Sequence, residues 1–263
     1  MKSILEFGRM REQGEKISMI TCYDAWSAKI IQSTPIDCIL IGDSCAMVMH
    51  GQPSTVFMEV ETMALHTRAV ARGAPGKFLI GDVPFLAHRK GLKPLMDAVE
   101  QLMKAGAHAV KVEGAAGHLS HIAHVVESGV PVMGHLGLTP QSVNQLGGFK
   151  VQGKGEEAAR RMMDDALSLE RAGCFALVLE CIPAPLAGEI TRLLTIPTIG
   201  IGSGPDTSGQ VLVLQDLLGM DPSFKPKFVR RYLDGYTQMR NALEHYHLDV
   251  KAGEFPVKEE SFV

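Results

Sequence analysis

The chain has 263 residues, a formal net charge of −3, 46% hydrophobic and 21% charged residues, as expected of a globular protein with a sizeable core. The nearly balanced charge, without a basic stripe, argues against a nucleic-acid partner. The longest apolar runs are too short to span a bilayer. Because the polar N-terminus also lacks the apolar segment of a secretory signal, we expect a cytoplasmic protein with no membrane partner.

Short runs rich in Val, Ile and Leu recur along the chain and alternate with longer helical patterns. Most runs are continuously apolar, which is typical of parallel strands buried on both faces. We predict eight strands, the last of which could equally belong to a helix: Ile17–Thr21, Cys38–Ile41, Phe78–Gly81, Ala109–Val112, Val130–Gly134, Ala176–Leu179, Pro197–Ile201 and Val211–Leu214.

Apolar residues at three- and four-residue spacing predict helices between these strands. The clearest are Leu92–Lys104, His118–Glu127 and Glu156–Ala172, and Phe224–His247 is a further predicted helix. Eight strand–helix units favour an α/β fold closed into a (β/α)8 barrel, forming one domain over residues 1–263.

A doubly wound open sheet is the main alternative fold. The segment after the first strand, Cys22–Trp26, contains no glycine, which disfavours a dinucleotide-binding domain of that kind. The glycine-rich segment Gly200–Gly204 is either a ligand-facing loop or a simple turn after the seventh strand.

The five cysteines form no C-x-x-C pair and their number is odd. Cys22, Cys38 and Cys174 lie inside apolar, strand-like runs. We therefore expect mainly buried, reduced thiols that pack as small hydrophobic side chains.

Polar or ionisable residues stand at the end of nearly every predicted strand. In a parallel barrel these ends converge on the face that carries the chemistry. Lys111 and Glu113 are two residues apart and therefore point to the same side of their strand. The converging set is Asp43, Asp82, Lys111, Glu113, His135 and Glu180, and Ser44 directly follows Asp43 at the end of the second strand.

Four carboxylates meeting with only one lysine and one histidine would repel one another unless a cation lay among them. An all-oxygen ligand set suits a hard divalent ion, Mg²⁺ before Zn²⁺. Such an ion keeps coordination positions for water or for a bidentate 2-oxo acid.

Each of these residues also has a structural interpretation. Asp43 and Ser44 could cap the next helix, Asp82 could belong to a turn, and His135 could be a hydrogen-bonded core histidine. The charges of Lys111 and Glu113 inside an apolar run are harder to explain without a function.

Several longer motifs resemble those of the ketopantoate hydroxymethyltransferase family, and the resemblance covers the chain from about residue 21 almost to its end. GHLGLTPQS is the most distinctive of them. The motifs are IGDSCAMVMHG (41–51), ARGAP (71–75), GDVPF (81–85), VKVEG (110–114), GHLGLTPQSVNQLGGFKVQGK (134–154), LVLECIP (177–183) and PTIGIGSG (197–204).

The resemblance implies a barrel of the phosphoenolpyruvate/pyruvate type and a role in pantothenate and coenzyme A biosynthesis. The implied reaction is Mg²⁺-dependent transfer of a hydroxymethyl group from 5,10-methylenetetrahydrofolate to 3-methyl-2-oxobutanoate, giving 2-dehydropantoate. It also implies a homodecamer built from pentamers.

By matching motifs, the resemblance assigns roles to individual residues. Asp43, Asp82 and Glu113 would form the Mg²⁺ site, partly through water. Ser44, Asp82 and Lys111, with the metal ligand Asp43 beside them, would contact the 2-oxo acid, and Glu180 would accept the proton. His135 lies in a family motif and is a possible pocket residue without an assigned role.

The chain departs from the family pattern at Cys45-Ala46, Phe57-Met58 and Ser203–Pro205, which leaves the shape of the pocket wall open. Two alternative functions are a folate-independent Mg²⁺ lyase or mutase acting on a 2-oxo acid, and a non-catalytic barrel that binds a metabolite. All four predicted acids are present, which disfavours the non-catalytic alternative.

Overall fold

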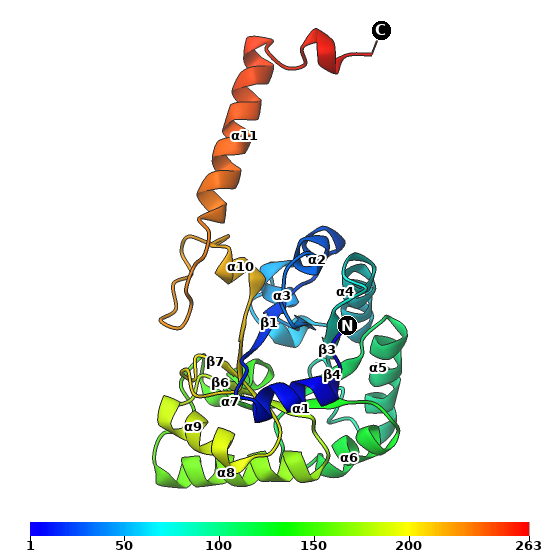
Figure 1. Cartoon of the computed structure of the whole chain (residues 1–263), viewed down its shortest axis with the longest axis vertical. Coiled ribbons are helices and arrows are strands. Elements are labelled where there is room, and N and C mark those ends of the chain that lie inside the picture. Colours follow the sequence, from blue (N-terminus) through cyan, green and yellow to red (C-terminus); the bar gives the residue numbers. More distant parts are fainter. Residues whose placement is uncertain (263) are drawn as a thin grey trace. The chain divides into compact units, whose positions relative to one another are not determined.

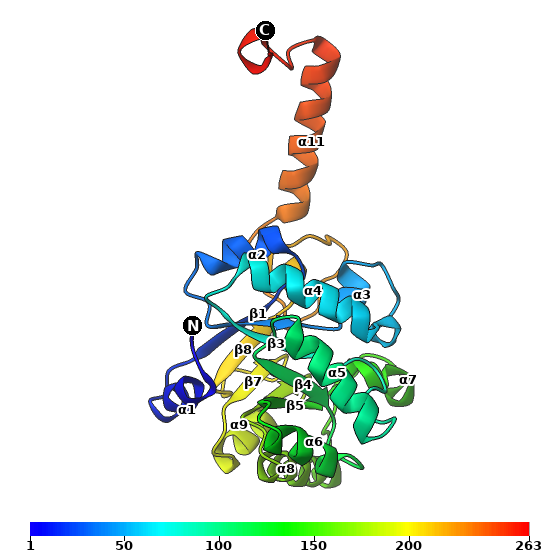
Figure 2. The same ribbon diagram turned by 90° about the vertical axis from the view of Figure 1, so that its right-hand side faces the viewer.

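The computed structural model describes residues 1–262, in which eight parallel strands form a closed barrel (Figures 1 and 2). Each strand pairs with the next, and β8 pairs with β1. This confirms the predicted (β/α)8 barrel and excludes the doubly wound open sheet. The strands are β1 (Ile17–Thr21), β2 (Cys38–Ile41), β3 (Phe78–Asp82), β4 (Ala109–Glu113), β5 (Val132–Gly137), β6 (Ala176–Glu180), β7 (Thr198–Ile201) and β8 (Gly209–Leu212).

Amphipathic helices surround the barrel and bury their apolar faces against it (Figure 2). The predicted helix over Leu92–Lys104 is confirmed. The helix predicted over His118–Glu127 begins one residue later, and the helix predicted over Glu156–Ala172 ends one residue earlier. The helices of the barrel unit are α1 (Ile4–Glu12), α2 (Ala25–Gln32), α3 (Cys45–Val48), α4 (Val60–Gly73), α5 (Leu92–Lys104), α6 (Leu119–Glu127), α7 (Val143–Leu146), α8 (Glu156–Arg171) and α9 (Ala184–Leu193), with short 3₁₀ helices η1 (Thr55–Phe57) and η2 (Pro140–Ser142).

The eighth strand begins two residues earlier than predicted. Gly209 pairs with Ile17, and a Cβ atom at position 209 would overlap the Ile17 backbone, so glycine is required there. A search for apolar runs misses such a strand start because Gly209 and Gln210 are not apolar. The Gln210 amide also donates to the Gly204 carbonyl at 2.9 Å. Within the Gly200–Gly204 segment, Gly200 and Ile201 end β7, and Gly202–Gly204 forms part of the turn between β7 and β8.

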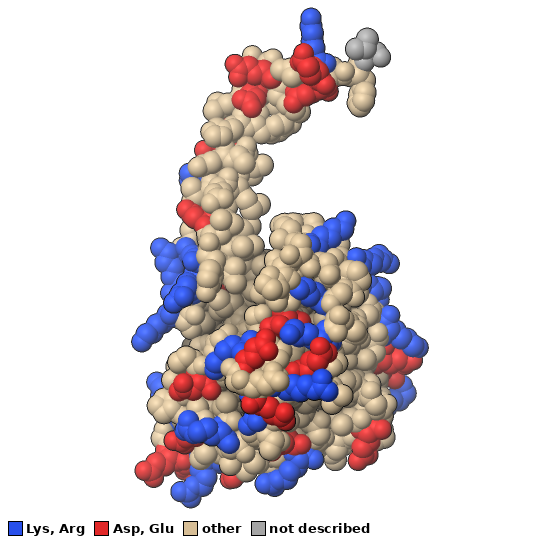
Figure 3. All heavy atoms as spheres, viewed as in Figure 1, with Lys and Arg blue, Asp and Glu red and all other residues tan. Residues whose placement is uncertain are grey.

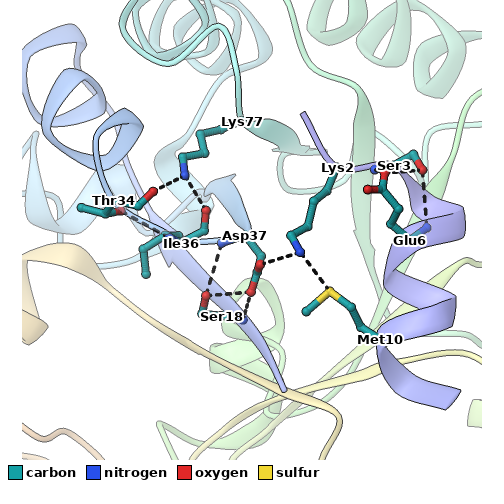
Figure 4. Close-up of polar contacts among 9 residues, drawn as sticks. All are labelled: Lys2, Ser3, Glu6, Met10, Ser18, Thr34, Ile36, Asp37 and Lys77. Atoms are coloured by element: carbon teal, nitrogen blue, oxygen red, sulfur yellow. Dashed lines mark hydrogen bonds and ion pairs between the residues drawn. The ribbon is translucent and has the colours of Figure 1, made fainter. Parts of the chain in front are cut away.

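Polar contacts fasten the N-terminal end of the barrel, opposite the face expected to carry the chemistry (Figure 4). The Asp37 carboxylate accepts hydrogen bonds from the Ser18 backbone and hydroxyl groups at 2.7 and 2.8 Å. Its other oxygen lies 3.2 Å from the Lys2 ammonium group. Lys77 donates to backbone carbonyls of the turn before β2. These contacts join β1, the turn before β2 and the N-terminal segment at the end of the barrel opposite the expected pocket.

The chain forms two compact units, residues 1–213 and the segment from Leu214 onward. The second unit contains α10 (Leu214–Leu217), α11 (Gly235–Ala252) and the 3₁₀ helix η3 (Lys258–Glu260). The predicted helix over Phe224–His247 was wrong at its start, since the helix begins only at Gly235. Pro226 lacks a backbone N–H, and the Arg231 guanidinium holds the preceding loop by donating to the carbonyls of Asp221 and Phe224. A single domain over residues 1–263 stays a prediction.

None of the helices among residues 1–262 combines the length and apolar character that a membrane crossing requires. On the barrel face drawn in Figure 3, acidic and basic side chains are interspersed, and no continuous basic stripe is visible on that face. The absence of a nucleic-acid partner stays a prediction.

Candidate active site

The C-terminal ends of the strands surround a pocket that every sequence-predicted site residue lines. Apolar side chains from β2, β6, β7 and β8 complete its wall. The polar lining comprises Asp43, Ser44, Asp82, Lys111, Glu113, His135 and Glu180. The structure thus brings these residues together as their positions at strand ends predicted.

The register of the parallel strands explains why oppositely charged groups meet at the bottom of the pocket. Lys111 of β4 lies beside Asp82 of β3, and its ammonium nitrogen is 2.8 Å from Asp82 Oδ1. Glu113, two residues further along β4, has Oε1 at 3.9 Å from the same nitrogen. Burial would lower the pKa of Lys111, but the charges of Asp82 and Glu113 outweigh it and raise that pKa. Lys111 is therefore a permanent cation in a site nearly closed to water.

His135 of β5 is paired in register with Glu113 and links two carboxylates. Its Nδ1 lies 3.4 Å from Glu113 Oε1, and its Nε2 lies 3.3 Å from Glu180 Oε2. Burial and the charge of Lys111 would lower the pKa of His135, but hydrogen bonding to Glu113 and Glu180 raises it to about 9. His135 is thus part of the charged network and not an isolated core histidine.

Asp43 follows β2, and its side chain faces the pocket and does not cap α3. Gln141 of η2 donates to Asp43 Oδ2 at 2.8 Å and to the Val83 carbonyl at 3.0 Å, while its backbone N–H donates to Glu113 Oε2 at 3.1 Å. The Asp43 N–H itself donates to Asp82 Oδ2 at 2.9 Å. Gln141 therefore holds two of the predicted metal ligands in place. Sequence reasoning missed it because its contacts depend on how the loop after β5 folds back.

Ser44 makes no side-chain capping bond to α3, which removes the structural interpretation for it. Its hydroxyl is 2.8 Å from the hydroxyl of Tyr23, a fully buried residue just after β1. Tyr23 was not predicted as a site residue. It lies in the segment Thr21–Asp24, where the family resemblance begins, and that was the available signal.

Glu180 is the most accessible carboxylate of the ion pairs in this pocket. Its side chain is 17% exposed, against 3% for Asp82 and 4% for Glu113. The next residue, Cys181, has a backbone φ of 47°, which is uncommon for residues other than glycine. Gly137, with φ of 98°, allows β5 to approach the Glu180 carbonyl, which a Cβ atom would block. The chain therefore turns sharply where it presents Glu180.

The pocket carries more negative than positive groups. When all are ionised, the carboxylates of Asp43, Asp82, Glu113 and Glu180 face only Lys111 and His135.

The three innermost acids respond differently to this environment. Burial, followed by the charges of Asp82 and Glu113, raises the pKa of Asp43 well above its ordinary value. Burial also raises the pKa of Asp82, although Lys111 opposes it. The pKa of Glu113 is lowered, because contacts with His135 and Lys111 outweigh burial. No ion pair to Asp43 occurs among residues 1–262, whereas Asp82 and Glu113 each have a cationic partner. A bound cation would therefore stabilise the ionised carboxylate of Asp43 most.

The donor chemistry fits Mg²⁺, provided that water supplies part of its shell. Asp43, Asp82 and Glu113 offer only oxygen ligands. They do not, however, form a group whose ligand atoms all lie within 4.8 Å of one another in the described chain. Mg²⁺ usually keeps several waters and one or two direct carboxylates. These residues could therefore hold Mg²⁺ with direct and water-mediated contacts combined.

Comparison with known proteins gives two levels of similarity. Solved structures of the same architecture include 2,3-dimethylmalate lyase, a member of the PEP mutase/isocitrate lyase superfamily, at 15% identity with a TM-score of 0.64, covering 100% of this chain and 92% of that one. Phosphonopyruvate hydrolase, at 12% identity, has a TM-score of 0.65 and coverages of 99% and 93%. At such identities the likeness shows the fold alone, which is the predicted (β/α)8 barrel. The phosphoenolpyruvate/pyruvate type of this barrel stays a prediction.

Sequence similarity is more specific. Residues 2–258 match the ketopantoate hydroxymethyltransferase family. A 3-methyl-2-oxobutanoate hydroxymethyltransferase of Bdellovibrio bacteriovorus is 59% identical over 262 residues, with 100% of both chains covered. A relative of the same name from Coxiella burnetii is 57% identical, with 95% of both chains covered. The chain therefore belongs to the ketopantoate hydroxymethyltransferase family, which confirms the expected family and its class, a hydroxymethyl-transferring enzyme.

Proposed function

We propose that the protein transfers a hydroxymethyl group from 5,10-methylenetetrahydrofolate to 3-methyl-2-oxobutanoate, giving 2-dehydropantoate for pantothenate and coenzyme A biosynthesis, and that it acts in the cytoplasm. The observation that carries this proposal is the position of Glu180. It is a partly accessible carboxylate on the wall of a pocket whose floor combines a buried lysine with carboxylates. A base, a cation and a metal-binding region are what deprotonation beside a ketone requires.

The 2-oxo acid would bind above the Asp82–Lys111 pair. Lys111 supplies a fixed positive charge for the substrate carboxylate. The Ser44 hydroxyl, held by Tyr23, supplies a hydrogen bond from the neighbouring wall. These groups orient the substrate and offset negative charge as it develops.

Glu180 would then remove the proton from C3 of the substrate. His135, whose Nε2 lies 3.3 Å from Glu180 Oε2, fixes the direction of the Glu180 carboxylate. Water adds to the folate's iminium form, in which the bond between N10 and the methylene carbon has already broken. The adduct releases this carbon as formaldehyde when its remaining bond to N5 breaks, and the two protons of water are left on the nitrogens of tetrahydrofolate. The carbanion forms the new carbon–carbon bond with the formaldehyde carbon, and the formaldehyde oxygen takes the proton that Glu180 removed and becomes the hydroxyl group of the product.

Asp43, Asp82 and Glu113 would hold Mg²⁺ with the help of water. When bound, the ion supplies Lewis-acid stabilisation of negative charge on the substrate oxygens. A protein of the same fold, phosphonopyruvate hydrolase, was crystallised in complex with oxalate and Mg²⁺. Oxalate, like a 2-oxo acid, offers two adjacent oxygen donors, which supports this arrangement.

The function is tested by incubating the protein with 3-methyl-2-oxobutanoate, Mg²⁺ and 5,10-methylenetetrahydrofolate. We expect 2-dehydropantoate to form, identified by mass spectrometry, and no product to form without the folate. Cleavage of a 2-oxo acid in the absence of folate would instead support the lyase alternative. Absence of both reactions in folded protein would contradict the proposal.

We predict that Asp43→Ala and Glu113→Ala each weaken binding of a divalent ion, because each removes a carboxylate from the proposed metal site. Isothermal titration calorimetry with Mg²⁺ measures the effect. Asp97→Ala, which removes an exposed carboxylate of a surface ion pair, is the matched control and should bind Mg²⁺ normally. Full activity after exhaustive chelation, or unchanged Mg²⁺ affinity in both variants, would show that the metal assignment is incorrect.

We also propose that the chain self-associates, as a decamer of pentamers. Within the second unit, α11 exposes apolar residues at alternating three- and four-residue spacing, which is the pattern of a helix that packs against a partner. These residues are Tyr236, Met239, Leu243, Tyr246 and Val250, between 43% and 68% exposed.

Light scattering at micromolar concentration should therefore give the mass of an oligomer. Leu243→Asp, at the most exposed of these positions, should shift the protein to smaller species. Glu244→Gln, on the same turn, should not. A monomeric mass for the unmodified chain would count decisively against self-association.

A further inference from the structure

Three potential ligands of a transition metal gather outside the carboxylate pocket lining. Cys45, His50 and His66 each offer one donor atom, and these atoms lie within 4.8 Å of one another. In the described part of the chain no other group of at least three His, Cys, Asp or Glu side chains meets this spacing. Cys45 begins α3, His50 follows the same short helix, and His66 belongs to α4.

The imidazole rings of His50 and His66 point their Nε2 atoms at each other across 2.9 Å. Two nitrogens bound to one tetrahedral Zn²⁺ at about 2.0–2.1 Å would lie roughly 3.4 Å apart. An opening of about half an ångström would thus admit the ion. His50 is exposed and could move by this amount without disturbing the core.

The tautomer of the neutral His66 ring is set by a backbone contact. Its Nδ1 lies 2.6 Å from the Tyr23 carbonyl oxygen, which can only accept a hydrogen bond. Nδ1 therefore carries the proton, and in the neutral ring the lone pair is on Nε2, the atom that faces His50. Metal-binding histidines are typically oriented by such a hydrogen bond from the second ring nitrogen.

The thiol of Cys45 is brought beside the histidines by the fold of α3. The Cys45 carbonyl accepts hydrogen bonds from the N–H groups of Met49 and His50 at 3.0 and 3.3 Å, which turns His50 back over Cys45. The side chain of Cys45 is completely buried. The buried sulfur and the exposed imidazole of His50 place the donors on the inner and outer sides of one small site.

We propose that Cys45, His50 and His66 form a binding site for a zinc-type divalent transition ion, separate from the carboxylate site. One sulfur and two imidazole nitrogens are ligands that Zn²⁺ or Co²⁺ prefers and Mg²⁺ does not. Water completes the tetrahedron on the solvent side. Binding displaces the thiol proton of Cys45 to the buffer, so that the sulfur binds as a thiolate.

Such an ion would stabilise the turn that carries part of the active site. Cys45 directly follows Asp43 and Ser44, and Tyr23 contacts both His66, through its carbonyl, and Ser44, through its hydroxyl. The ion would therefore link α3 to α4 behind the Ser44 turn. Its role would be structural, because its three ligands do not line the pocket.

The test uses full-length, metal-stripped protein titrated with Co²⁺ in excess Mg²⁺, which keeps the carboxylate site filled. We expect one tight Co²⁺ per chain, with the visible bands of tetrahedral cobalt and a near-ultraviolet thiolate-to-cobalt band. Zn²⁺ should remove these bands and raise the thermal unfolding midpoint. Cys45→Ser should abolish the thiolate band.

Because Cys45 is buried, its replacement could prevent folding, so a second variant changes the exposed ligand His50. His50→Gln should weaken Co²⁺ binding by at least roughly tenfold, the size of effect seen even for outer-shell changes at metal sites. The controls are His124→Gln, an exposed histidine elsewhere, and Cys181→Ser, a partly exposed thiol. Both should keep the wild-type spectrum. No thiolate band, or an unchanged band in folded Cys45→Ser or unchanged affinity in His50→Gln, overturns the proposal and leaves His50 and His66 as a hydrogen-bonded pair.

Discussion

Replacing Glu180 with Gln should slow exchange of the substrate's C3 proton with solvent deuterium by roughly 10²- to 10⁴-fold, the usual contribution of a positioned base. Glutamine keeps the size and hydrogen bonding of the side chain but removes the basic oxygen. His135, the other titratable group near this position, lies 3.3 Å from Glu180 and is unchanged in this variant. Exchange followed by NMR, without folate, measures proton removal separately from carbon–carbon bond formation.

The same variant separates the base from the metal site. Asp43, Asp82, Glu113 and Lys111 are untouched, so Mg²⁺ and the 2-oxo acid should still bind. Glu189→Gln makes the same chemical change at an exposed position on α9 and should exchange at the wild-type rate. If Glu180→Gln also exchanges at that rate, Glu180 is not the base. If exchange and Mg²⁺ affinity fall together, Glu180 belongs to the metal site.

The sequence predicted the barrel and the convergence of its polar strand ends because both depend on local patterns. An apolar run followed by an acid marks a buried strand and its end, whatever lies elsewhere in the chain. The register of β3, β4 and β5 then places Asp82 beside Lys111 and Glu113 beside His135. This is why the members of the pocket could be named from sequence, whereas their roles remain proposals.

What the sequence could not predict depends on how loops return to the barrel. Gln141 reaches Asp43 only because η2 folds over the pocket, and Tyr23 reaches Ser44 only because β1 and β2 are neighbours. Likewise, nothing in the spacing of His50 and His66 indicates that the fold places their Nε2 atoms 2.9 Å apart. The separation of the three metal-site carboxylates also comes only from the structure, and it agrees with the water in the Mg²⁺ shell that the family resemblance already implied.

The buried Lys111–Asp82 pair is expected to have a large effect on the free energy of unfolding. Two lysine–aspartate pairs in this protein have almost the same geometry but opposite exposure. Lys111 lies 2.8 Å from Asp82 with side chains 4% and 3% exposed, and Lys93 lies 2.7 Å from Asp97 with side chains 84% and 52% exposed. Removing one partner of a buried pair leaves an uncompensated charge in a medium that solvates it poorly. Removing one partner of an exposed pair leaves a charge that water solvates well.

Lys111→Met should therefore lower the free energy of unfolding by about 3–5 kcal/mol, whereas Lys93→Met should lower it by less than about 1 kcal/mol. Methionine retains most of the lysine's length, so neither variant creates a large cavity. Urea denaturation in the presence of a chelator measures both variants, and chelation prevents a bound divalent ion from compensating for the lost lysine.

A double variant distinguishes the unpaired charge from loss of packing. If the cost of Lys111→Met arises from Asp82 left charged and buried, adding Asp82→Asn should recover a large part of it, because the amide needs no counter-ion. If the cost arises from packing around the lysine stem, the second substitution should recover nothing. A Lys111→Met cost no greater than that of Lys93→Met would mean that the pocket floor is better hydrated than its 3–4% exposure indicates. The buried cation proposed to hold the substrate would then lie in a far more polar medium, and its attraction for a carboxylate would be correspondingly weaker.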